Sequence, residues 1–210
     1  MFGIDNYGLF LVSSLLLHLS PGQDTLYILG RCMAQGRRAG VVSVAGIGAG
    51  ILVHTMLAAL GLSVVLATSA MVFNIVKYAG AAYLVWMGIG LLRKTRADIH
   101  WKPEQKPNLR PWKLFHQGML TNALNPKVAL FFLSFLPQFV NPGSDLVFLP
   151  FMLLGLSFFV TGGLYCLLLV YASDWLTGRL KGPSRLGAMA GKLTGALFIG
   201  LGIKLAMSRR

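Results

Sequence analysis

Charged residues are scarce in this chain of 210 residues, where they make up 12% of the sequence and only six are acidic. A soluble domain carries about 25% charged residues, because these side chains cover the surface that faces water. With 55% hydrophobic residues, this chain could not cover itself in that way. Apolar runs of about 20 residues, the length that crosses a bilayer, recur along the sequence. The scarcity of charge predicts an all-α integral membrane protein.

Other absences exclude several functions. The two cysteines, Cys32 and Cys166, have no metal or redox spacing and are expected to be small packing residues. Residues 1–6 contain Asp5 but no basic residue, which argues against a cleavable signal peptide. The chain has no H-E-x-x-H motif, nucleophile elbow, dinucleotide loop or P-loop. We expect no enzyme, no ATP-driven pump, no cofactor and no bound metal.

Six apolar segments predict six transmembrane helices. They lie at Tyr7–Cys32, Gly40–Leu66, Ala70–Leu92, Leu114–Phe139, Leu146–Ser173 and Gly187–Met207. The formal charge of +13 could indicate nucleic-acid binding, but most basic residues lie between these segments, where they set membrane orientation. We therefore expect membrane lipids as partners and no nucleic acid.

Most lysines and arginines lie in or near the first, third and fifth connections. The positive-inside rule places those connections in the cytoplasm and both termini outside, in a bacterial inner membrane. The longest connection, residues 93–113, contains three prolines among polar residues and predicts a flexible cytoplasmic linker. Its basic residues can also attract anionic lipid headgroups. The whole chain, residues 1–210, is then one transmembrane domain, with the linker at its midpoint.

The segments on either side of this linker resemble each other. Ser20-Pro21 in the first helix corresponds to Asn125-Pro126 in the fourth, and residues 77–84 resemble residues 192–199. These landmarks predict two repeats, at about residues 1–92 and 114–210. Three helices are an odd number, so consecutive repeats have opposite orientations in the membrane. Such inverted repeats are common in secondary transporters.

Both landmarks contain a proline, which breaks a helix interior. Ser20-Pro21-Gly22-Gln23 has the pattern of a capping box, with serine at N-cap, proline at the first helical position and glutamine at the third. Asn125-Pro126 repeats the device with asparagine as the cap. The sequence predicts that the first and fourth helices are both broken.

An intramembrane charge follows each break. Each new helix start exposes unpaired N–H groups and the positive end of a dipole, which can bind a carboxylate. Lys127, at the second helical position, adds a positive charge, and Asp24, placed at the fourth, supplies a negative one. This pairing suits a zwitterion, although a structural Asp24–Lys127 ion pair is the alternative.

We therefore predict a small amino-acid-like substrate. The predicted substrate-binding residues are Ser20, Pro21, Gly22, Gln23, Asp24, Asn122, Asn125, Pro126 and Lys127. Asp24 is the predicted proton-coupling group, and His18 and His54 are further candidates, because histidine can relay protons. Neighbouring helices could equally satisfy either histidine.

Small residues indicate close helix packing. Gly46-x-Gly48-x-Gly50 and Gly191-x-x-x-Gly195 permit close helix contacts, which we expect within one subunit. Contact between two copies in a homodimer is the alternative.

The motifs together resemble the LysE/RhtB family of amino-acid exporters. They are residues 20–26, 35–40, 124–132 and 135–139, and the similarity extends over nearly the whole chain. The resemblance implies efflux of amino acids or derivatives, driven by proton antiport. In the family a second proline usually occupies the position of Gln23, and its absence here leaves an extra N–H donor at the site.

Two other functions remain open. The first is export of another small solute or of a metal cation, although the predicted spans hold one carboxylate and the cysteines and histidines do not cluster. The second is a non-transporting membrane scaffold. A scaffold predicts no aqueous cavity around Asp24 and Lys127.

Overall fold

The computed structural model describes residues 3–20, 22–62, 70–93, 108–141, 148–173 and 175, and scattered residues between 192 and 207. The described part is built from helices, and its one β-bridge joins Ile4 to Val140. The helices, in order, are α1 (Tyr7–Leu19), α2 (Gln23–Leu57), η1 (Ala58–Leu62), α4 (Ala70–Arg93), α5 (Pro111–Ala123), α6 (Pro126–Ser134), η3 (Leu136–Phe139) and α7 (Phe148–Tyr171). Helices α4 and α7 match the predicted third and fifth spans within two residues.

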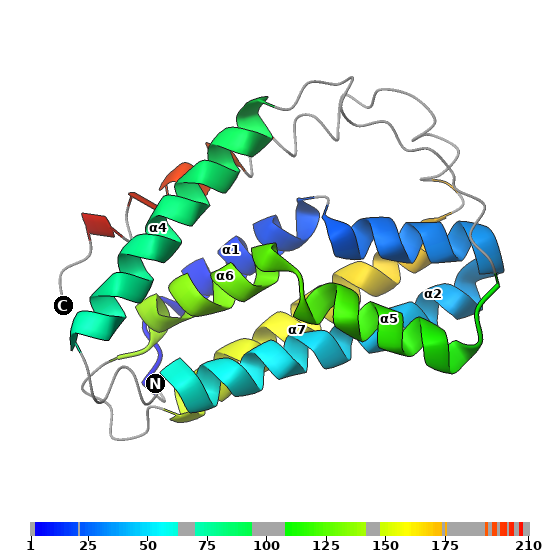
Figure 1. The fold of residues 1–210 in the computed structure, drawn as a ribbon, viewed down its shortest axis with the longest axis horizontal. Coiled ribbons are helices and arrows are strands. Elements are labelled where there is room, and N and C mark those ends of the chain that lie inside the picture. The colour runs from blue at the N-terminus through cyan, green and yellow to red at the C-terminus, as the bar shows by residue number, and fades with distance from the viewer. Residues whose placement is uncertain are drawn as a thin grey trace.

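Helix α2 consists of two arms, residues 23–35 and residues 37–57, that are joined at Gly36. Gly36 has φ 77° and ψ −179°, a backbone conformation that is essentially restricted to glycine. The second arm runs back alongside the rest of the molecule, beside α5 (Figure 1). The loop predicted between the first two spans is thus reduced to a reversal at one residue.

Two broken helices lie beside each other in opposite directions. One is α1 with the first arm of α2, and the other is α5 with α6 (Figure 1). Hydrogen bonds between them join Asp5 to Phe139, Leu17 to Lys127, Tyr27 to Leu114, and Gln35 to Leu109. Residue numbers rise along one partner and fall along the other, so the two helices are antiparallel and their breaks meet near the middle.

This antiparallel pair has the relative orientation expected of inverted halves. The six-helix repeat layout itself stays a prediction, because only scattered residues of the predicted sixth span are described. Most of the linker also lies outside the described residues. Within the described part, two helices are long and apolar enough to cross a membrane, Gln23–Leu62 and Phe148–Tyr171. The pair Pro111–Ala123 and Pro126–Phe139, bent by 49°, makes a third if it forms one broken span.

Glycines allow the second arm of α2 to pack closely against α5. A Cβ atom on Gly46 would collide with the Phe115 carbonyl oxygen, and one on Gly50 would lie 2.7 Å from the Asn122 Cβ. On α5, a Cβ atom added to Gly118 would lie 2.7 Å from the Ser43 carbonyl oxygen of α2. The predicted packing role of Gly46 and Gly50 within one subunit is confirmed, and this seam holds Asn122 next to the break.

Glycine also sets the contact between α4 and the C-terminal segment. A Cβ atom on Gly88 would lie 2.6 Å from the Gly195 carbonyl oxygen. Phe10, Phe131 and Phe158 are at most 1% exposed and form an aromatic core between α1, α6 and α7. The two broken helices are therefore held by packed neighbours on both sides, and the polar residues at the breaks lie between them.

Candidate functional site

The first break lies where it was predicted, but its cap differs. Helix α2 begins at Gln23 and its N-cap is Gly22, with no side-chain cap, so the predicted capping box at Ser20 is wrong. Ser20 instead ends α1 in an extended conformation, φ −71° and ψ 115°. The residue before a proline is pushed out of the helical region, which delays the new helix. Asp24 is consequently the second residue of α2, and not the fourth.

The second break follows the prediction. Helix α5 ends at Ala123, and Pro126 occupies the first position of α6. The Asn125 Oδ1 atom accepts a hydrogen bond from the Lys127 backbone N–H at 3.0 Å, so asparagine is the N-cap. Lys127 is the second residue of α6, in the position that corresponds to Asp24 in α2.

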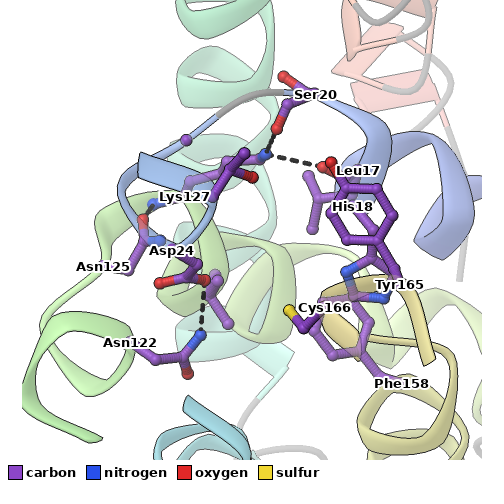
Figure 2. A pocket seen from close by; sticks show the side chains of 13 residues that line it. Leu17, His18, Ser20, Asp24, Asn122, Asn125, Lys127, Phe158, Tyr165 and Cys166 are labelled. Atoms are coloured by element: carbon purple, nitrogen blue, oxygen red, sulfur yellow. Dashed lines mark hydrogen bonds between the residues drawn. The ribbon is translucent and has the colours of Figure 1, made fainter. Parts of the chain in front are cut away.

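Each new helix start contacts the end of the helix that precedes the other break. The Lys127 Nζ atom donates to the carbonyl oxygens of Leu17 and Ser20, both at 2.7 Å (Figure 2). These carbonyls end α1, where a helix leaves acceptors without internal partners and carries the negative end of its dipole. In the reverse direction, the Asn122 Nδ2 atom at the end of α5 donates to Asp24 Oδ2 at 2.8 Å. We call these two links the crossed contacts.

Several polar groups surround the partly buried side chain of Asp24. Its Oδ1 atom is buried and makes no hydrogen bond with a described residue. Lys127, His54 and the Asn125 side chain also lie near the carboxylate. A carboxylate that is withdrawn from water and incompletely bonded responds strongly to any cation that enters its surroundings.

A cavity of about 30 Å³ lies between the two breaks and α7. This is room for about two water molecules, and less than an amino acid needs. The predicted site residues that line it are His18, Ser20, Gly22, Asp24, Asn122, Asn125 and Lys127. Gln23 is exposed and Pro126 is not part of the lining, while Pro21 lies outside the described residues.

The two histidines occupy different surroundings. The His18 ring lines the cavity, packs 4.4 Å from the centre of the Phe158 ring, and is 3.3 Å from Thr161 Oγ1 at its Nε2 atom. The His54 ring lies outside the lining, and its Nε2 atom is 3.1 Å from the Asn122 carbonyl oxygen. His54 thus contacts the residue that binds Asp24, whereas His18 faces α7. Their part in proton coupling stays a prediction.

Helix α7 contributes a wall that the sequence analysis did not identify. Phe158, Tyr165 and Cys166 line the cavity opposite the polar residues (Figure 2). A spacing of seven and eight residues places them on one helical face, and Gly162 between them lets the His18 ring approach. This spacing is the signal that could have found them, but an apolar helix offers many such faces.

Comparison with known proteins finds relatives that cover nearly the whole chain. An uncharacterised membrane protein of Pseudomonas aeruginosa is 33% identical over 208 residues, which is 97% of this chain and 96% of that protein. A homoserine/homoserine lactone efflux protein of Salmonella typhimurium is 31% identical, covering 95% of each chain. A leucine efflux protein of Klebsiella pneumoniae is 28% identical, covering 98% of this chain and 96% of its own.

No solved structure matches this chain significantly. The family profile described as LysE type translocator matches residues 15–209, nearly the whole chain and both helix breaks. Members of that family are transporters and not enzymes. The chain therefore belongs to the LysE type translocator family, as the motifs at its two breaks indicated.

Proposed function

We propose that this protein is a secondary transporter that exports a small amino acid or a derivative from the cytoplasm by proton antiport. The observation that carries the proposal is the cavity where two antiparallel broken helices meet, with Asp24 and Lys127 in its lining. Broken helices facing each other inside a membrane protein are the usual architecture of a transported-solute site. The two efflux relatives, named for leucine and for homoserine, support an amino-acid substrate.

The ends of a zwitterion find different partners at this site. The substrate ammonium group binds Asp24, whose Oδ1 atom is buried without a hydrogen bond in the described part of the chain. The substrate carboxylate binds near the start of α2, which has no side-chain cap, and near Lys127. A Cβ atom added to Gly22 would lie 3.5 Å from Lys127 Nζ, so the backbone and the ammonium group are close together there.

Asp24 couples export to protons in this proposal. An ionised carboxylate at membrane depth is costly unless a cation accompanies it. The substrate ammonium group is that cation on the outward step, and a proton replaces it after the substrate has left. The neutral, protonated carrier then returns to the cytoplasmic side. Both termini face outward in the inner membrane, because the basic connections face the cytoplasm.

The cavity supports this proposal over its alternatives. A membrane scaffold would have no reason to keep a cavity beside Asp24 and Lys127, and the cavity lies there. Export of a metal cation is disfavoured by its lining, since it contains one carboxylate together with the ammonium group of Lys127.

Efflux from proteoliposomes tests the proposal. Purified protein is reconstituted, the vesicles are loaded with a panel of labelled amino acids, and efflux is followed with and without a proton gradient. We expect gradient-dependent efflux that Asp24→Asn abolishes while the folded protein remains in the membrane. Asp5→Asn is the matched control, because Asp5 is exposed and lies at the start of α1. Full gradient-driven efflux by Asp24→Asn would remove Asp24 from the coupling mechanism.

A further inference from the structure

The cavity has two chemically different sides. Asp24, Asn122, Asn125 and Lys127 form the polar side, and Phe158, Tyr165 and Cys166 of α7 lie across from them (Figure 2). Leu17 and Val128 add further hydrocarbon to the lining. A zwitterion held by the polar side would direct its side chain toward α7.

The described lining of the cavity contains few charged groups. Asp24 is the one carboxylate in the described lining. Lys127 donates to two carbonyl oxygens at 2.7 Å each. These oxygens lie at the end of α1, where the helix itself provides them with no donor. A substrate with a second ammonium group would find no second carboxylate, and one with a second carboxylate would have to draw Lys127 away from α1.

The wall formed by α7 offers little compensation for a second charge. Phe158 is 1% exposed and Cys166 is 6% exposed, while Tyr165 is half-buried and adds one uncharged hydroxyl group, so the wall is largely withdrawn from water and carries no carboxylate. An unpaired charge placed against such a surface keeps a large desolvation cost. A hydrocarbon side chain gains free energy from burial at the same place.

We infer that this cavity selects amino acids with uncharged, predominantly apolar side chains and rejects both dibasic and acidic ones. The inference rests on the proposed function and adds the substrate class. In the described state the cavity is too small for any amino acid, so it must widen before binding. The proposal takes the wall chemistry of the described lining, with its one carboxylate, to decide the selection.

The test uses the full-length protein in proteoliposomes loaded with equal concentrations of leucine, methionine, lysine or glutamate. Leucine and methionine should leave at least about a hundredfold faster than lysine or glutamate, the ratio expected for an unpaired buried charge. Lysine or glutamate efflux within about tenfold of leucine efflux would overturn the selection and leave the transport function standing. Absence of efflux for every amino acid would instead overturn the proposed function, and this inference with it.

A substitution in α7 provides a gain-of-function test. Cys166→Asp adds a carboxylate to the apolar wall and should raise the lysine-to-leucine efflux ratio by at least about tenfold. Cys166→Asn has the same shape without the charge and should leave this ratio low. An equal rise in both variants would contradict a charge-based selection. If the aspartate variant fails to insert, competition of unlabelled lysine with labelled leucine in the unaltered protein still decides the question.

Discussion

Replacement of Lys127 by methionine should destabilise the protein through the loss of two specific hydrogen bonds. The ammonium group donates to the carbonyls of Leu17 and Ser20 at 2.7 Å each. A hydrogen bond to a charged group contributes about 1.5–3 kcal/mol. Because Lys127 is partly buried, we take the lower end for each bond, which gives about 3 kcal/mol for the pair. The methionine side chain keeps the apolar contacts and removes the donor.

The loss converts to a shift in the melting temperature. In a chain of this size, 1 kcal/mol corresponds to about 2–4 °C, so Lys127→Met should melt about 6–12 °C below the unaltered protein. Thermal unfolding of purified protein in mild detergent measures the shift. Lys113→Met is the control, since Lys113 is exposed at the start of α5, and it should change the melting temperature little. If Lys127→Met has the same melting temperature as Lys113→Met, the hydrogen bonds from Lys127 to Leu17 and Ser20 do not hold the breaks together.

Three further predictions concern the backbone and the topology. Gly36→Ala places a Cβ atom on a residue with φ 77° and should destabilise the reversal in α2 by about 1–3 kcal/mol, measurable by denaturant unfolding. Gly46→Leu should separate α2 from α5 and lower both the folded yield and the melting temperature, whereas Gly61→Leu, where an added Cβ atom meets open space, should be tolerated. In a cysteine-free background, Ala97→Cys should resist an impermeant reagent in intact cells; labelling from outside would reverse the proposed orientation.

The sequence predicted the second break better than the first. Asn125-Pro126 is a strong local pattern, because the asparagine cap and the proline at the first position act within three residues. Ser20-Pro21 looked like the same pattern, yet Gly22 extends the chain with φ −141° and ψ −169° and becomes the cap. A local pattern cannot decide between two residues on either side of a proline that are both compatible with a cap. The position of Asp24 changed accordingly.

The contacts across the site lay beyond sequence reasoning. Lys127 was identified as an intramembrane cation, but its acceptors are backbone carbonyls 107 and 110 residues away. Every residue has a carbonyl, so no residue type indicates which ones a lysine will reach. The glycines of α2 were recognised as packing residues, whereas their partner Gly118 in α5 was not, because the pairing depends on how the two helices cross.

The crossed contacts also limit the symmetry that the centre of this chain can have. Each broken helix places a charged residue at the second position after its break, an aspartate in one and a lysine in the other. Two identical polypeptides related by a twofold axis would carry the same residue at both places and bring like charges together. A single continuous chain can instead diversify the two places independently. Opposite charges at this centre are therefore a property that a symmetric assembly of two identical halves cannot possess.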